Sequence, residues 1–269
     1  MFDAHCHLHL AAFDADRDQA LARARRAGVT GFCSCAIGPG DFQAALDLAA
    51  REAGVVVGLG VHPLALGGWA EGEDGDVLAA LDACLDRSDA RLVALGECGL
   101  DGRLNDRVSP ARQRRILEAQ LARAHERRLP VILHCVREQA ALLDSLRRFP
   151  GVRALLHAFS GSLEQARALL ALDAELFFSF GGALTLPSKK RRALVRGLPR
   201  GRLLVETDAP DGPPIRLPDK AAPPAARLEP ARLPDVVAAL AALREEPLEA
   251  WRAQARQSAM ALFQSQNLQ

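Results

Sequence analysis

The chain has 269 residues, and its 34 basic and 33 acidic residues leave a net charge of +1. Hydrophobic residues make up 49% and charged residues 25%, as in ordinary soluble globular proteins. The balanced charge excludes a global basic field for binding nucleic acid, although a local basic patch is compatible with it. The sequence has no apolar run of about 18 residues and no signal-peptide pattern, so we expect a cytoplasmic protein without a membrane partner.

In chain order, apolar runs alternate with amphipathic stretches from end to end. Glycine, proline and serine signals at the borders set their limits. We expect strands at 2–7, 29–37, 55–61, 92–96, 131–134, 152–157, 175–180 and 203–206. We expect helices at 16–27, 41–53, 77–87, 109–128, 138–149, 162–172, 188–196, 231–243 and 247–263.

The strand segments are apolar throughout rather than alternating, which is typical of a parallel sheet covered on both faces. Eight strand–helix repeats favour an α/β fold, a single TIM-type (β/α)8 barrel that fills residues 1–269 as one domain. The stretch 210–230 contains seven prolines and no apolar periodicity, so we expect a long loop there. Such a loop is either functional or a surface excursion.

Six cysteines lie at positions 6, 33, 35, 84, 98 and 135 and form no CxxC pair. Four of them fall inside strand-like runs or beside histidines, where a small apolar side chain packs well. We therefore expect reduced cysteines and no disulfide framework.

The pattern Asp3-Ala4-His5-Cys6-His7 opens the chain. Alternate side chains of a strand point to one face, so His5 and His7 project together and Cys6 faces away. Paired imidazoles suit Zn, Fe, Ni or Cu better than Mg. Further candidate ligands stand at or just after the ends of later apolar runs, namely Glu97, His134, His157 and Asp208.

The carboxyl ends of barrel strands meet at one face, which is where barrel enzymes build their active sites. Six nitrogen and oxygen donors are too many for one tetrahedral zinc ion, and they fit two metal ions that share a carboxylate. Each residue also has an ordinary structural interpretation. A single histidine at a strand end is commonly a hydrogen-bonded core residue, and Glu97 or Asp208 could cap a turn.

Three other histidines have different surroundings. His62 ends the third strand, where it contacts substrate or is a loop residue held by the following proline. His9 lies beyond the first strand, and we expect it to support the site or lie at the surface. His125 belongs to a charge-rich helical stretch and is expected to be solvated.

These motifs resemble the TatD family of metal-dependent hydrolases over nearly the whole chain, and the region around Asp208 is most similar to its YjjV branch. The matching segments, in the family's order, are Asp3-Ala4-His5-Cys6-His7-Leu8, Gly60-Val61-His62-Pro63, Gly96-Glu97-Cys98-Gly99-Leu100-Asp101, Leu129-Pro130-Val131-Ile132-Leu133-His134, His157-Ala158-Phe159-Ser160-Gly161 and Glu206-Thr207-Asp208-Ala209-Pro210. Three positions depart from the common pattern: His9, Ala158 and an arginine, Arg137, that comes one place late.

The resemblance implies a barrel of the metal-dependent hydrolase superfamily with two divalent ions (Mg, Mn or Zn). By position, His5, His7 and Asp208 would hold one ion, and His134 and His157 the other. Glu97 would bridge them.

The site chemistry then assigns further roles. Asp208 would orient or deprotonate the attacking water, which makes it catalytic together with Glu97. Glu206 has the parity of Asp208 and would support the site. Arg137 is a candidate phosphate clamp. The run Lys189-Lys190-Arg191-Arg192 either adds positive charge at the mouth of the site or is a solvated helix start.

Three functions follow. The first is a TatD-type deoxyribonuclease that cleaves phosphodiester bonds in DNA or in a small phosphate ester. The second keeps the metals and cleaves an ester or amide, as in deacylation of an aminoacyl-tRNA. The third is a binding platform without catalysis, which the intact set of ligands argues against. No obligate protein partner is evident.

Overall fold

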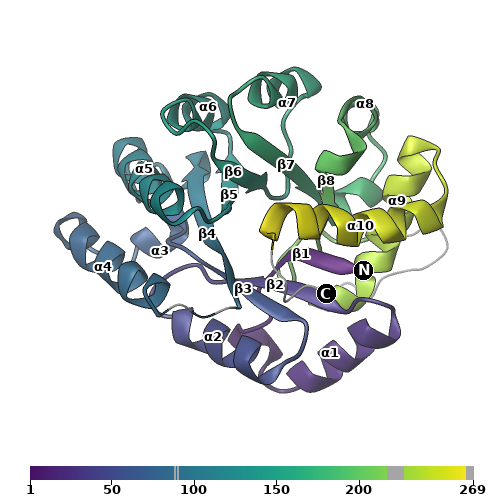
Figure 1. Ribbon diagram of the computed structural model, residues 1–269, viewed down its shortest axis with the longest axis horizontal. Coiled ribbons are helices and arrows are strands. Elements are labelled where there is room, and N and C mark those ends of the chain that lie inside the picture. The colour runs from purple at the N-terminus through teal and green to yellow at the C-terminus, as the bar shows by residue number, and fades with distance from the viewer. Residues whose placement is uncertain (88, 90, 217–226, 265–269) are drawn as a thin grey trace.

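The computed structural model describes residues 1–87, 89, 91–216 and 227–264. Eight parallel strands follow one another around a barrel in the order of the sequence, and helices cover the outside (Figure 1). This confirms the predicted (β/α)8 fold. The strands are β1 Phe2–Cys6, β2 Gly31–Cys35, β3 Val55–Leu59, β4 Leu92–Asp101, β5 Val131–Val136, β6 Arg153–Leu156, β7 Glu175–Phe180 and β8 Leu203–Val205.

Helices lie between successive strands, and the last two helices follow β8, as predicted. Serine side chains open three of them: Ser109, Ser162 and Ser188 each accept a hydrogen bond from a backbone N–H of the first turn. The helices are α1 Arg17–Arg26, α2 Phe42–Arg51, α3 Pro63–Leu66, α4 Asp74–Leu85, α5 Pro110–Arg127, α6 Gln139–Leu146, α7 Leu163–Leu170, α8 Lys189–Gly197, α9 Leu233–Arg244 and α10 Leu248–Phe263. Short 3-10 turns lie at Ala11–Phe13, Glu71–Glu73, Gly102–Leu104, Gly182–Thr185, Arg200–Arg202 and Pro230–Arg232.

The barrel closes where the first strand meets the residues that follow the last. The backbone N–H of Asp208 donates to the carbonyl of His5 at 2.9 Å, and that of His7 donates to Ala209 at 2.7 Å. These bonds bring residues from the two ends of the chain into one ring, and they set Asp208 beside the opening histidines.

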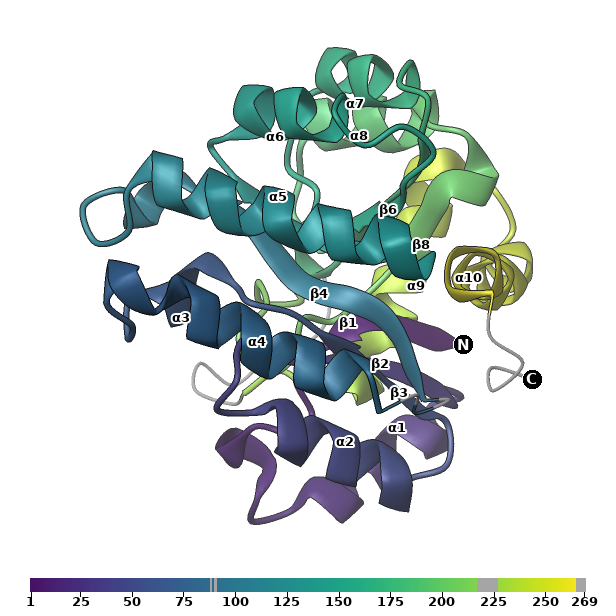
Figure 2. The ribbon, with the colours of Figure 1, turned by 60° about the vertical axis from the view of Figure 1, so that its left-hand side comes forward.

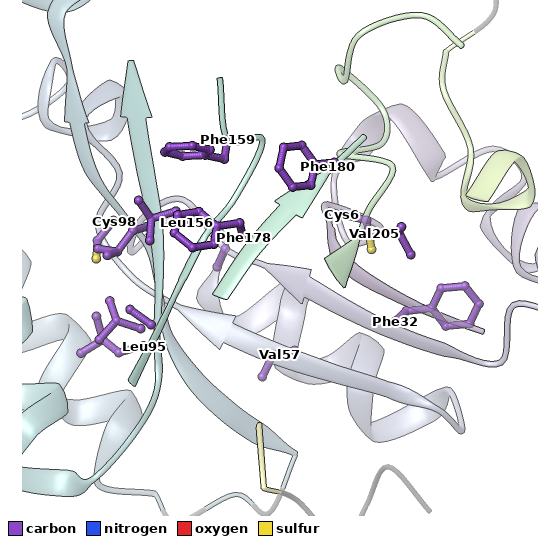
Figure 3. Packing of buried hydrophobic residues seen from close by; sticks show 14 of the residues in the cluster. Cys6, Phe32, Val57, Leu95, Cys98, Leu156, Phe159, Phe178, Phe180 and Val205 are labelled. Atoms are coloured by element: carbon purple, nitrogen blue, oxygen red, sulfur yellow. The ribbon is translucent and has the colours of Figure 1, made fainter. Parts of the chain in front are cut away.

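Two apolar cores hold the barrel. The larger one fills the space between strands and helices, and it includes Cys6, Phe178 and Leu156 (Figure 3). The smaller one fills the barrel interior at the amino ends of the strands, where Phe263 of α10 packs against Phe2 with ring centroids 5.7 Å apart. Because this smaller core fills the amino end of the barrel, polar side chains can gather at the opposite, carboxyl end.

The main departure from the predicted elements is β4, a long curved strand that crosses the molecule in Figure 2. The prediction of a short strand at 92–96 is wrong, because pairing with β5 continues through Gly99, opposite His134, to Asp101, opposite Val136. Glu97 therefore lies inside a strand and not after one. The four-residue helix α3 was not predicted, and α4 begins three residues earlier than expected.

The predicted loop at 210–230 lies partly outside the described residues. Its described parts, 210–216 and 227–229, contain no helix or strand, and a 3-10 turn begins at Pro230. In the part of the chain that the structure describes, no helix is both long and apolar enough to cross a membrane.

Candidate metal centre

The six predicted ligands converge at the carboxyl end of the barrel. They come from five different strands or from the residues directly after them, and all but Asp208 are buried as whole residues. Their donor atoms form three overlapping groups that are compact enough to hold a metal ion, and two of these groups contain Glu97. The members are His5, His7, Glu97, His134, His157 and Asp208, joined in one group by His62.

Glu97 lies at the centre of the site, and its two oxygens face different groups. Oε2 is 3.3 Å from Nε2 of His5 and 3.6 Å from Nε2 of His7. Oε1 is 3.0 Å from Nδ1 of His134 and 2.8 Å from Nε2 of His157. The neighbouring imidazoles hold the pKa of Glu97 well below its usual range, although burial opposes them. The carboxylate is therefore negatively charged and faces two distinct pairs of nitrogens.

Asp208 completes the first of these groups. Its Oδ1 is 3.5 Å from Nε2 of His5 and 3.4 Å from Nε2 of His7, and those two nitrogens are 3.2 Å apart. Donor atoms bound to one zinc ion at about 2.0–2.1 Å in a tetrahedral site lie roughly 3.3 Å from one another. The spacing around His5, His7 and Asp208 therefore fits a shared divalent ion.

The hydrogen bonds of His7 fix which of its nitrogens is free. Nδ1 lies 2.6 Å from the backbone carbonyl of Cys35, which can only accept, so Nδ1 carries the proton. A neutral His7 then presents the lone pair of Nε2 to the carboxylates of Glu97 and Asp208. Although burial lowers it, the two carboxylates raise the pKa of His7 to about 8. This position attracts a cation, either a proton or a metal ion.

His134 has the reverse arrangement. Its Nε2 donates to Oδ2 of Asp101 at 3.1 Å, which leaves the Nδ1 lone pair facing Glu97. Although burial opposes them, hydrogen bonds from His134 and Arg103 hold the pKa of Asp101 below its usual value, so its carboxylate is ionised. A carboxylate behind a ligating histidine is a common feature of zinc sites, because it fixes the ring and raises its basicity.

Asp101 belongs to one of the sequence motifs, but the sequence alone did not predict a role for it. Its position along the strand could have identified Asp101, because residues an even number of positions apart on a strand share a face. Asp101 is four residues after Glu97 on the same strand, so both side chains point to the same face. Ending the strand at Gly96 concealed this relationship.

His62 approaches the same centre with different chemistry. Its Nδ1 accepts a hydrogen bond from the backbone N–H of Leu64 at 3.0 Å, so the proton of the neutral ring is on Nε2. Nε2 lies 3.4 Å from Oε1 of Glu97. Burial lowers the pKa of His62 to about 4, which keeps the ring neutral. His62 therefore offers the site a hydrogen-bond donor instead of a lone pair.

Glu206 lies behind His157. Its Oε1 accepts from the backbone N–H of Ala158 at 2.8 Å, and its Oε2 accepts from the hydroxyl of Ser179. Nδ1 of His157 is 3.7 Å from Oε1 of Glu206. With no exposed surface, the Glu206 carboxylate is held in one orientation.

The remaining candidates lie away from the cluster. Arg137 is exposed directly after β5, and within the described residues it forms no hydrogen bond or ion pair. His9 contacts the hydroxyl of Ser34 and the carboxylate of Asp41, at 2.9 and 3.1 Å, so it is a buried neighbour of the site and not a member of the cluster. His125 is exposed on α5, as predicted. Cys6 packs into the larger apolar core, between strands and helices, and its thiol donates to the Cys33 carbonyl; its side chain faces away from the cluster, as predicted.

Comparison with known proteins identifies the family of this chain. The family model described as TatD related DNase matches residues 2–264. The uncharacterized metal-dependent hydrolase YjjV of Escherichia coli is 37% identical over 213 residues, which cover 78% of this chain and 80% of that protein. The 3'-5' ssDNA/RNA exonuclease TatD of Erwinia billingiae is 35% identical over 269 residues, 98% of each chain.

Among solved structures, that of YjjV from Escherichia coli superimposes with a TM-score of 0.87 at 33% identity and covers 98% of both chains. A TatD family hydrolase from Entamoeba histolytica, 20% identical, gives a TM-score of 0.84 and shares the fold. The family model and these relatives match the chain over most of its length, and the two solved structures share its barrel fold. The chain therefore belongs to the TatD-related DNase family of metal-dependent hydrolases.

Proposed function

We propose that this protein is a two-metal hydrolase that cleaves phosphodiester bonds in single-stranded DNA. The observation that carries the proposal is the position of Glu97, whose two oxygens face separate pairs of histidine nitrogens at 2.8–3.6 Å. One bridging carboxylate between two donor groups is what a two-ion site requires. The names of the relatives support nucleic acid as the substrate.

We assign His5, His7 and Asp208 to one ion, His134 and His157 to the other, and Glu97 to both. Four imidazoles and two carboxylates favour Zn²⁺ or Mn²⁺ over Mg²⁺, which prefers oxygen ligands. When bound, such ions lower the pKa of a water molecule toward neutrality and polarise the phosphoryl oxygen. Asp101 and Glu206 orient the rings of His134 and His157 from behind.

Exposure separates the roles of the two acidic residues. The side chain of Asp208 keeps 20% of its surface exposed, whereas that of Glu97 keeps 4%. Asp208 is therefore the carboxylate that a water molecule and a substrate can reach, and it would orient that water and accept its proton. Glu97, surrounded by four rings, would serve to keep the two donor groups together.

His62 and Arg137 would bind the substrate. The Nε2–H of the neutral His62 points into the cluster and can donate to a phosphoryl oxygen. Arg137 stands at the exposed end of β5 with its whole guanidinium free of described partners, so it can form a bidentate contact with a phosphate at the rim. We also propose that the whole chain acts as one barrel domain, in the cytoplasm.

The test is a comparison of substrates and variants. Protein stripped of metal and reloaded with Mg²⁺, Mn²⁺ or Zn²⁺ is offered single-stranded DNA and an aminoacyl ester side by side. DNA cleavage should require added metal and fall by at least about a hundredfold in Asp208→Asn and Glu97→Gln, because each loses a charged ligand. Asp211→Asn, an exposed acid three residues after Asp208, is the matched control and should retain activity.

Cleavage of the ester with DNA left intact would replace the nuclease assignment with an esterase. A metal content well below one ion per chain, with no activity restored by any added ion, would refute the two-metal site itself.

A further inference from the structure

A cavity of about 270 Å³ adjoins the metal centre and has no role in the function proposed so far. It lies between the loops that follow β6, β7 and β8, at the carboxyl end of the barrel. Its apolar lining comes from Phe159, Phe180, Leu184 and Leu194, and two cations of α8, Lys190 and Arg191, line it as well.

The apolar floor is fixed before any ligand arrives. Phe159 packs edge-on against Phe178 with centroids 4.8 Å apart, and only 7% of Phe159 is exposed. Figure 3 shows Phe159 and Phe180 on the same side of Phe178. A rigid apolar surface can bind a flat ring without first having to order its own side chains.

The cationic side of the cavity has hydrogen-bonding capacity to spare. Nζ of Lys190 donates to the backbone carbonyl of Ser160 at 3.1 Å, which holds the ammonium over the loop after β6. An ammonium has three donors, so two remain for an incoming anion. Arg191 uses one guanidinium nitrogen on the Leu186 carbonyl, and its other donors are free within the described residues.

The cavity and the metal centre share a wall. Ala158 directly follows His157, and the backbone N–H of Ala158 donates to Glu206. Both Ala158 and Glu206 line the cavity. None of the six predicted ligands lines the cavity itself, so a substrate whose phosphate sat at the metal cluster would reach the cavity by passing over this wall.

We propose that the cavity is the subsite for the nucleoside next to the scissile phosphate of a single-stranded nucleic acid. The base lies on the floor formed by Phe159 and Phe180, and Lys190 neutralises a neighbouring phosphate. The volume is slightly below the roughly 300–1,000 Å³ of pockets for drug-sized ligands, which suits a single base. An apolar platform beside cations is also how single strands are bound without reading their sequence. The proposal rests on the function proposed above.

Binding of a fluorescently labelled short DNA strand, in the presence of a chelator so that it is not cleaved, tests the cationic part. Lys190→Gln should weaken binding about fivefold and reduce the slope of log K against log salt by roughly 0.7, the value for one lost phosphate contact on a single strand. Lys189→Gln removes the same charge from the neighbouring position, which does not line the cavity, and should change both quantities much less. Equal effects of the two substitutions would refute a phosphate contact at Lys190.

A substitution that fills the cavity tests the base-binding floor. Ala183 lines the cavity and is half-buried, so Ala183→Leu adds a branched side chain there. It should lower kcat/KM for the DNA strand about tenfold, near the lower end of what stacking of one base contributes. It should leave hydrolysis of an abasic strand of the same length, which has no base to place in the cavity, within twofold. Ala193→Leu, on the exposed surface of α8, is the control.

If Ala183→Leu lowered kcat/KM equally for both substrates, or for neither, the subsite proposal would be refuted even though the nuclease assignment stood. If the wild-type protein cleaved neither substrate, the proposed function would fail instead, and the binding comparison of Lys190 with Lys189 would still decide the subsite. Loss of folding in Ala183→Leu, seen as a lower Tm, would leave that same comparison as the deciding measurement.

Discussion

Asp3, on the first strand, accepts two hydrogen bonds from Thr207, which follows the last strand. The backbone N–H of Thr207 donates to Oδ1 at 2.9 Å, and its hydroxyl donates to Oδ2 at 2.6 Å. Neither residue has exposed surface. The pair therefore fastens β1 to the segment after β8, one residue before Asp208, and it sets the distance between Asp208 and His5.

Replacement of this hydroxyl should weaken the closure. Thr207→Val keeps the shape of the side chain but leaves Oδ2 of Asp3 buried without its partner, which costs about 1–3 kcal/mol of unfolding free energy. Metal affinity should fall as well, because Asp208 is the next residue. Urea denaturation measures the first effect and metal titration the second. Thr30→Val, at an exposed position, should change neither, and equal losses in both variants would contradict a specific role for the pair.

Asp101 should control metal affinity without being a ligand. In Asp101→Asn the negative charge behind Nε2 of His134 is lost, so the ring becomes less basic and less well oriented. Removal of such partners typically costs 10–100-fold in metal affinity, and we expect about that loss in calorimetric titration with Zn²⁺. Arg103→Ala removes the exposed neighbour of Asp101 and should have a far smaller effect. An unchanged affinity in Asp101→Asn would show that the hydrogen bond is structural only.

Gly60 should not tolerate a side chain, because β3 and β4 lie unusually close at the site. A Cβ at Gly60 would come within 2.6 Å of the Gly96 Cα and 2.8 Å of the Glu97 carbonyl, both backbone atoms that cannot turn aside. Gly60→Ala should destabilise the protein by about 1–3 kcal/mol and lower activity by displacing Glu97. Gly75→Ala, in α4 with open space around it, should stabilise by about 0.5–1 kcal/mol. A neutral result at Gly60 would contradict the close approach.

The pH dependence of stability should reveal the ion pairs of Asp74. Burial opposes them, yet contacts of its carboxylate with Arg112 at 2.7 Å and with Arg115 at 2.7 Å lower its pKa from the ordinary 3.8. A carboxyl whose folded pKa is depressed stabilises the protein above its unfolded pKa, and this contribution is lost as pH falls through the folded value. Between pH 5 and pH 3, a range that includes the ordinary carboxyl pKa of 3.8, the Tm of the wild type should therefore drop more than the Tm of Asp74→Asn. Parallel curves for the two proteins would contradict the shift.

The sequence predicted the barrel and the convergence of the six candidate ligands because both depend on periodicity. Apolar runs and the alternation of strands and helices are local signals, and the parallel topology then places strand ends at one face. Asp101 was given no role because the predicted strand ended at Gly96, whereas pairing with β5 continues the strand to Asp101. That pairing depends on register between segments, which a single sequence does not specify.

The sequence also did not predict which nitrogen of each histidine carries the proton. His7 is fixed by the Cys35 carbonyl and His62 by the Leu64 N–H, and both are backbone groups whose positions follow from the folded structure. Residue types alone left His62 as either a substrate contact or a loop residue, and only its hydrogen bond with Leu64 shows which of its nitrogens carries the proton. Contacts from side chains to the backbone are the least predictable part of the site.

The closure of β1 against the residues after β8 also has a consequence for folding. His5 and Asp208 lie about 200 residues apart in the chain, so half of the cluster forms only after nearly all of the strands have been made and ordered. A partly synthesised barrel would carry the first histidines without their carboxylate. A metal ion that binds only the closed ring favours that state by mass action. Occupation of the proposed metal site would therefore be thermodynamically linked to the last step of assembly.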